Sequence, residues 1–202
     1  GAKPTRKKSN PSISDPANQT WPLMYFRDKE LVFDKPLIMG IINLTPDSFS
    51  DGGKFLKNNS YIDIDKNKVQ KEIETLENYG ASFIDIGAES TRPGHTVIST
   101  QQEIDRLMPI LEIVSKSNCV ISIDTRKPEV MREVLKYKIG LINDVSALES
   151  LESKEIIRDA KIPVCVMHNR RDNSVSIEAD INNFFQYKVQ ELTSIGISNE
   201  NI

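Results

Sequence analysis

Apolar runs that end abruptly on polar side chains recur along this chain, and amphipathic stretches separate them. The runs predict strands near residues 37–43, 82–87, 119–124, 140–144 and 163–168. Apolar residues at helical spacing predict helices near 65–79, 100–117, 128–138, 152–160 and 176–195. Strands that alternate with helices pair in parallel through right-handed crossovers, so the pattern predicts an α/β protein.

The number of strand–helix units leaves two architectures open. Five units are visible in 202 residues, whereas a closed (β/α)8 barrel takes about 250 residues. The chain is therefore either a smaller doubly wound sheet or a barrel from which the last units are missing. Before the first unit, residues 23–35 contain two short apolar segments around Arg27-Asp28-Lys29, which predicts a β-hairpin.

Composition separates a tail from the folded part of the chain. Residues 1–22 are rich in Lys, Ser, Asn and Pro, which predicts a flexible linker or tail before a domain at 23–202. A formal net charge of -3 argues against a nucleic-acid partner. No apolar run approaches the roughly 18 residues of a membrane span. Since no secretory pattern opens the chain, the cytoplasm is the expected location.

Each predicted strand finishes on polar residues. Asn43 ends the first, Asp85 and the loop 89–94 end the second, and the others end at Asp124, at Asn143 and at His168. A single strand-end Asp or Asn often only satisfies the N–H groups of a loop. Because the carboxyl ends of parallel strands meet on one rim, five of them together predict a shared site.

These segments resemble a known family. Asn43–Gly53 and Gly87–Gly94 are similar to the two signature segments of dihydropteroate synthases, and Ser122–Thr125 and Ile142–Ser146 to that family's next two strand ends. The resemblance runs from about Leu23 to Ile202. It implies a (β/α)8 TIM barrel, of which about the first five βα units are present after the hairpin. It also implies condensation of 6-hydroxymethyl-7,8-dihydropterin pyrophosphate with p-aminobenzoate, giving dihydropteroate and pyrophosphate, with Mg²⁺.

The resemblance assigns roles to named residues. It implies pterin contacts from Asp124, Asn143, Met167 and Val145, and pyrophosphate contacts from Ser90, Thr91, Arg92 and Asn43. Asn43 resembles the Mg²⁺ ligand, and Phe49 and Pro93 lie on the loops that shape the p-aminobenzoate pocket. Asp124 is the main catalytic candidate, because a carboxylate can stabilise positive charge on the pterin ring. A single neutral amide binds Mg²⁺ weakly, so the metal is expected to arrive with the pyrophosphate.

Several residues keep two interpretations. Asp51 is a catalytic candidate near the metal or a turn residue, and Asp85 supports the site or is a structural carboxylate held by Arg92 or a loop N–H. His95 is expected in an exposed loop and His168 in packing at the rim. Cys119 and Cys165 lie inside apolar runs and are predicted to be buried, reduced thiols. The long loop 45–63 is predicted to be mobile until substrates bind.

The chain also departs from the family. Ala88 replaces a common Gly, and the segment after His168 differs from the usual loop, so no role is carried over from it. The late Asp-Pro-Gly, Lys and Arg-x-His motifs are absent, so this segment is expected to be a fragment that is inactive alone.

Two alternatives and two partner hypotheses stay open. A barrel of the methyltetrahydrofolate methyltransferase type also binds a pterin through strand-end Asp and Asn residues. Such a barrel does not require the segments 45–53 and 90–94, so these segments distinguish the two types. A non-catalytic synthase-like subunit is the other alternative. The family is commonly dimeric, so a homodimer is expected, and the tail suggests fusion to an upstream pterin pyrophosphokinase. The other expected partners are the small-molecule substrates.

Overall fold

A parallel sheet organises the computed structural model, which describes residues 20–46, 54–57 and 63–202. Its five strands are β3 (Met39–Asn43), β4 (Phe83–Gly87), β5 (Val120–Asp124), β6 (Leu141–Asp144) and β7 (Val164–Val166). They lie side by side in the order in which they occur along the chain. A doubly wound sheet reverses its strand order at a switch point, whereas a barrel wall does not. The sheet therefore has the topology of a barrel wall.

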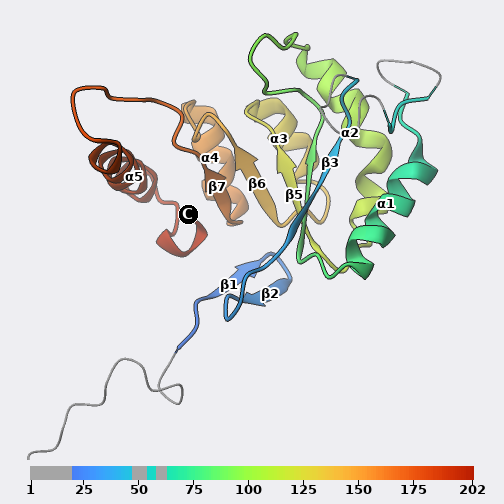
Figure 1. Cartoon of the computed structure of the whole chain (residues 1–202), viewed down its shortest axis with the longest axis horizontal. Coiled ribbons are helices and arrows are strands. Elements are labelled where there is room, and N and C mark those ends of the chain that lie inside the picture. The colour runs from blue at the N-terminus through green and yellow to red at the C-terminus, as the bar shows by residue number, and fades with distance from the viewer. Residues whose placement is uncertain (1–19, 47–53, 58–62) are drawn as a thin grey trace, which may run out of the picture.

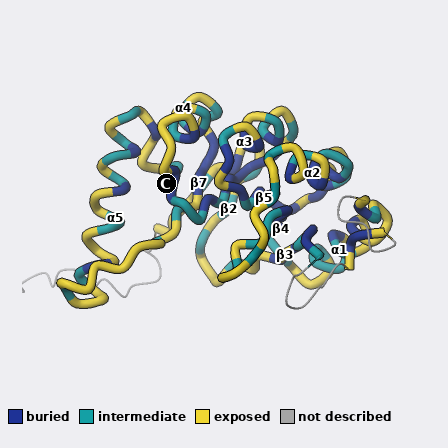
Figure 2. The backbone as a smooth tube through the Cα atoms, turned by 90° about the horizontal axis from the view of Figure 1, so that it is seen from above, coloured by how far each residue is buried: buried dark blue, intermediate teal, exposed yellow. Residues whose placement is uncertain are grey.

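Four helices cover one face of this sheet: α1 (Lys66–Asn78), α2 (Thr100–Val114), α3 (Pro128–Val134) and α4 (Leu151–Ala160). They stand in a row along that face in Figure 2. α5 (Ile177–Ser194) and a short 3₁₀ helix (Asn199–Asn201) follow β7 and lie beside it in Figure 1. None of the described helices is long and apolar enough to cross a membrane.

The main core lies between the sheet and these helices. Alternate strand residues point into it, and Ile42, Ile84, Ile123 and Ile142 are fully buried there. The residues between them point to the other face, which we call the inner face of the sheet. At its β3 edge, Met39 and Ile41 are 39% and 57% exposed. The described elements therefore leave part of the inner face open to solvent.

The predicted hairpin covers the lower end of the inner face. β1 (Leu23–Phe26) and β2 (Lys29–Val32) pair antiparallel, and Phe26 is buried against Phe83 with ring centroids 5.1 Å apart. Phe26, Phe83, Val120 and Leu141 form a second, smaller core. The hairpin thus closes the end of the sheet opposite the carboxyl ends of its strands (Figure 1).

Two helices end earlier than their sequence pattern predicts, α2 at Val114 and α3 at Val134. The hairpin binds the carbonyl groups beyond these ends. Lys29 Nζ donates to Ser117 O at 2.9 Å and Arg27 Nη2 donates to Leu135 O at 3.3 Å. Such contacts between distant segments satisfy terminal carbonyls that a longer helix would otherwise use. After α3 the apolar pattern continues, because Leu135 and Tyr137 also pack on the main core.

One cysteine prediction is wrong. Cys119 is buried as expected, but Cys165 is exposed, because its side chain points to the inner face rather than to the helices. Both thiols are free. The predicted tail, residues 1–22, falls mostly outside the described residues and stays a prediction.

Candidate functional site

The carboxyl ends of the strands carry one continuous row of residues on the inner face. The strand register pairs Asn43 with Gly87, Gly87 with Asp124, Asp124 with Asn143 and Asn143 with Cys165. We call these five residues the rim row. Three residues that the sequence assigned to the ligand site, Asn43, Asp124 and Asn143, are thus neighbours or near neighbours in a single layer.

A gap separates Asn43 from Asp124 in the rim row, because Gly87 has no side chain. A Cβ atom at Gly87 would lie 3.8 Å from Asn43 Oδ1 and 3.7 Å from Asp124 Oδ2. Both oxygens therefore border the same space above the Gly87 backbone. This space joins the residue assigned to the pyrophosphate and metal with the residue assigned to the pterin.

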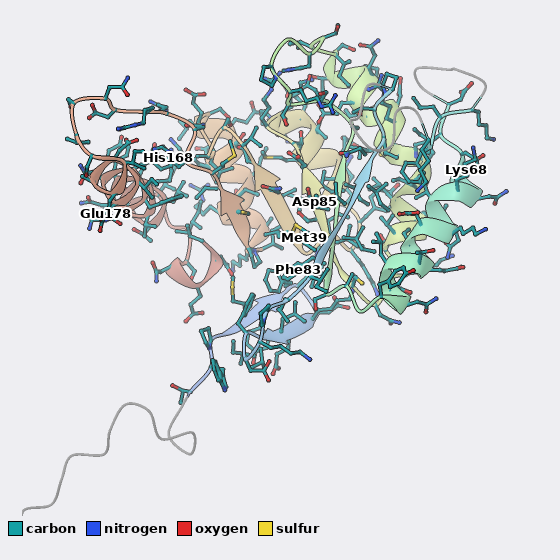
Figure 3. The ribbon with its side chains drawn as sticks, viewed as in Figure 1. Met39, Lys68, Phe83, Asp85, His168 and Glu178 are labelled. Carbon is teal, nitrogen blue, oxygen red and sulfur yellow. The ribbon has the colours of Figure 1, made fainter. Side chains whose placement is uncertain are left out.

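A second polar layer lies directly beneath the rim row. Asp85 pairs with Ile41 on one side and with Ser122 on the other. Its Oδ1 accepts a hydrogen bond from Ser122 Oγ at 2.6 Å, and its Oδ2 accepts one from Asn143 Nδ2 at 3.4 Å. Asp85 is 6% exposed, and burial raises the pKa of its carboxyl group. Figure 3 labels Asp85 among the central strands, far from His168 near α5.

Asp124 titrates close to neutral pH. Burial raises the pKa of its carboxyl group to about 7, and the negative charges of Asp85, Glu103, Asp144 and Glu89 contribute in that order. Burial disfavours the charged form, and nearby carboxylates disfavour it further. A carboxyl group with a pKa near the working pH can both accept and release a proton. Asp124 therefore has the properties of a group that responds to positive charge on a ligand.

The loop after β4 brings a second set of predicted residues to the rim. Thr91 and Asp124 line the same small recess of about 10 Å³, together with Thr125 and Val145. Ser90 lines a separate, larger hollow of about 460 Å³ with Pro46, Val97 and Arg106. The structure thus brings Thr91 next to Asp124 but directs Ser90 to the neighbouring hollow. Pro93 is exposed on the same loop, and Ser90 Oγ accepts a hydrogen bond from Arg92 N at 3.3 Å.

A buried ion cluster fixes this loop to the loop after β5. Lys127 Nζ lies 3.0 Å from Glu89 Oε2 and 3.0 Å from Glu103 Oε2, and it donates to Ile98 O at 2.7 Å. Arg126 Nη2 lies 3.2 Å from Glu89 Oε1. The sequence pattern did not predict this cluster, although Glu89 and Lys127 each lie close to a predicted site residue or strand end. The cluster positions the loop of Thr91 relative to the tip of β5.

The two histidines have local structural contacts. His168 Nε2 lies 3.0 Å from Asp180 Oδ2, and its ring packs edge-on against Phe184 at 5.1 Å. This agrees with the packing role expected for His168. His95 is half-buried rather than exposed, and its Nδ1 lies 2.5 Å from Arg92 O. Neither contact joins a histidine to the rim row.

Of the four remaining predicted site residues, the structure describes two. Met167 lies two residues beyond Cys165 and is 46% exposed, and Val145, two residues beyond Asn143, is half-buried. Phe49 and Asp51 lie outside the described residues, as does most of the loop 45–63. In the part of the chain that the structure describes, no group of three or more His, Cys, Asp or Glu side chains could hold a metal ion.

Comparison with known proteins identifies the family. A family model described as pterin binding enzyme matches residues 39–202. The chain is 37% identical over 188 residues to the dihydropteroate synthase of Haemophilus influenzae, which covers 89% of this chain and 66% of that protein. The folate synthesis bifunctional protein of Arabidopsis thaliana is 41% identical over 143 residues, which covers 68% of this chain and 28% of that protein.

A solved structure agrees with these relatives. The dihydropteroate synthase of Xanthomonas albilineans with 4-aminobenzoic acid has a TM-score of 0.75 at 32% identity. The match covers 90% of this chain and 65% of that chain, so the chain spans about two thirds of the length of these two synthases. A parallel barrel wall with a polar rim at its carboxyl ends defines an α/β enzyme fold. The chain belongs to the pterin binding enzymes, and the predicted fold is confirmed.

Proposed function

We propose that this chain serves the dihydropteroate synthase reaction, in which p-aminobenzoate displaces pyrophosphate from 6-hydroxymethyl-7,8-dihydropterin pyrophosphate. The rim row carries the proposal, because it brings Asn43, Asp124 and Asn143 into one layer. The relatives named dihydropteroate synthase, one of them solved with 4-aminobenzoic acid, support the same reaction.

In this proposal Asp124 and Asn143 bind the ring of the dihydropterin. The pyrophosphate leaves from a CH₂ group attached to an electron-rich ring, so positive charge develops on the ring as the bond breaks. Asp124 is half-buried at the rim, and its carboxylate stabilises this charge. Positive charge that develops beside Asp124 favours its ionised form. It therefore offsets part of the rise in the pKa of Asp124 that burial and the neighbouring negative charges cause.

The departing pyrophosphate meets donors from the adjacent loop. Thr91 shares a recess with Asp124, so its hydroxyl is close to the ring end of the ligand. Arg92 follows on the same loop and supplies a guanidinium, which suits phosphate oxygens, while Ser90 supports the loop through its hydrogen bond to Arg92 N. Phe49 and Pro93 border the p-aminobenzoate pocket in this proposal.

Asn43 is the proposed Mg²⁺ ligand. It contributes one neutral oxygen beside the Gly87 gap, and Mg²⁺ commonly binds through one or two protein oxygens plus substrate phosphates. The donor set thus suits a metal that is held together with the pyrophosphate. Bound Mg²⁺ would neutralise charge on the leaving group. Asp51 is a further candidate for contributing to this metal, and Asp85 acts through other residues.

The proposal also covers the location of the protein in the cell and its partners. Free thiols at Cys119 and Cys165 suit a reducing compartment, which supports the cytoplasm. The relationship to a bifunctional folate synthesis protein supports a fusion to another folate enzyme, and the homodimer remains part of the proposal.

The test is an assay of the complete gene product for pyrophosphate release in the presence of Mg²⁺. Release should depend on both the dihydropterin substrate and p-aminobenzoate. Absence of turnover with this pair would reject the proposed reaction, and methyl transfer from methyltetrahydrofolate would favour the alternative barrel type.

Substitution of Asn43 tests the metal assignment in the same assay. Asn43→Ala should lower the rate by about 10- to 100-fold at limiting Mg²⁺ and should recover in part when Mg²⁺ is raised. Asn118→Ala is the matched control, because Asn118 is exposed at the opposite end of the sheet. An unchanged Mg²⁺ dependence in Asn43→Ala would remove Asn43 from the metal site.

A further inference from the structure

Two hydrogen bonds, one buried and one partly buried, connect the layer beneath the rim to the residue proposed to bind the ligand ring. Ser122 Oγ donates to Asp85 Oδ1, and Asn143 Nδ2 donates to Asp85 Oδ2. Ser122 is fully buried and Asp85 nearly so, whereas Asn143 stands in the rim row above them. Each oxygen of the Asp85 carboxylate therefore receives one donor, and the second donor belongs to a site residue.

This contact sets the orientation of the Asn143 carboxamide. A carboxamide has one acceptor oxygen and two N–H donors, and its oxygen and nitrogen ends are nearly the same in shape. An ionised carboxylate only accepts hydrogen bonds, so the nitrogen end must face Asp85. One N–H is then used below the rim. The carbonyl oxygen and the second N–H remain for a ligand, in a fixed order.

The surroundings of Asp85 show that a carboxylate is not needed there for packing. In the same layer, its neighbour on β3 is Ile41. The next layer below contains Met39, Phe83 and Val120. Burying a carboxylate costs free energy unless its hydrogen bonds compensate, and burial raises the pKa of Asp85. An apolar residue would fill the position at lower cost. The cost is explained if the carboxylate acts on Asn143.

We propose that Asp85 is a positioning residue that fixes the Asn143 carboxamide, so that the rim selects a ring edge with an acceptor nitrogen next to an amino donor. The inference rests on the proposed function for the identity of the ring. The selected class is a 2-aminopyrimidinone edge, whose ring nitrogen accepts and whose amino group donates. A 2-oxo ring presents the reversed order, an N–H donor next to a carbonyl acceptor, and is rejected.

The test compares two probes in the complete gene product. 6-Hydroxymethylpterin has the 2-amino group, and 6-hydroxymethyllumazine has an oxygen in its place. The wild-type protein should bind the pterin at least about tenfold more tightly, because the mismatched ring leaves buried polar groups unpaired. In Asp85→Asn, the residue at position 85 can donate or accept, so the Asn143 amide can turn over. The pterin-to-lumazine affinity ratio should then fall by about tenfold.

A stability control separates this role from a general effect on folding. Ser117→Ala removes a different buried hydroxyl group, whose Oγ donates to Glu77 Oε1 at 2.5 Å near the hairpin end of the sheet. This variant should lose some stability while keeping the wild-type affinity ratio. A folded Asp85→Asn protein with the wild-type ratio would overturn the proposal, whereas a wild-type protein that binds neither probe would overturn the proposed function instead.

The wild-type protein offers a test that does not depend on a variant's folding. One of the two side-chain amide protons of Asn143 is bonded beneath the rim, and the other faces the ligand space. In ligand-free protein, nuclear magnetic resonance should show one of these protons exchanging with solvent much more slowly than the other. Two protons that exchange equally fast would overturn the proposed anchoring by Asp85.

Discussion

At the scale of single residues, position in the sheet changes the chemistry of ordinary side chains. Asp124 lies in the rim row among other carboxylates, and these surroundings raise the pKa of its carboxyl group to about 7. Asp85, one layer below, is instead held by Ser122 and Asn143. The sequence identified Asp124 as the main catalytic candidate but left Asp85 as either a supporting or a structural carboxylate, because partners and burial depend on strand register.

The raised pKa of Asp124 predicts a pH-dependent effect on stability. The folded state holds the Asp124 proton more tightly than the unfolded state, so this stabilisation is full below about pH 4 and is lost as pH rises through 7. Asp124→Asn removes the buried charge. In ligand-free protein it should raise the free energy of unfolding by about 4 kcal/mol at pH 8, and by about 2 kcal/mol at pH 5.

Urea denaturation at the two pH values measures this difference, and Asp159→Asn is the control. Asp159 is exposed, and its hydrogen bond with Arg158 lowers the pKa of its carboxyl group, so its neutral variant should not gain stability at high pH. Equal stability changes at pH 5 and pH 8 in Asp124→Asn would contradict the burial argument. Turnover should fall in Asp124→Asn even where stability rises.

At the scale of elements, strand-end loops act together because buried charges join them. Most strands and helices followed from apolar periodicity, since each buries one face against the main core. The early ends of α2 and α3 did not, because the hairpin binds the carbonyl groups of Ser117 and Leu135 just beyond these ends. The cluster of Lys127 with Glu89 and Glu103 was also missed, because its members are far apart in sequence and have no common motif.

The buried cluster predicts a large stability loss when its cation is removed. Lys127→Met leaves Glu89 and Glu103 close together without their common partner, which should cost about 3–5 kcal/mol in the free energy of unfolding. Lys136→Met is the control, because Lys136 forms an exposed pair with Glu133 and should lose under about 1 kcal/mol. Chemical denaturation compares them. Similar losses in both variants would show that the buried cluster contributes no more than a surface pair.

At the scale of the whole molecule, the two ends of the sheet have different roles. The hairpin stabilises the lower end, and the rim carries the polar side chains. The hairpin packs Phe26 over Phe83 at the lower end, and the polar side chains gather at the upper end. The sequence alone left a doubly wound sheet open as an alternative. Strand order resolved it, because five strands follow one another without reversal.

Loss of the hairpin's main aromatic contact should destabilise the entire domain. Phe26→Ala removes a ring that is 3% exposed in the second core, which should cost about 3–5 kcal/mol. Tyr25→Ala, on the exposed side of the same strand, should change stability by less than about 0.5 kcal/mol. Thermal unfolding of both variants measures the difference. A small effect of Phe26→Ala would mean that the domain does not depend on the hairpin.

The bare backbone at Gly87 limits how this protein can change. The space between Asn43 Oδ1 and Asp124 Oδ2 already has its greatest width, since glycine is the smallest residue. Every substitution at position 87 makes this space narrower, and none makes it wider. Mutation of Gly87 can therefore exclude bulky molecules from the space, but it cannot admit larger ones.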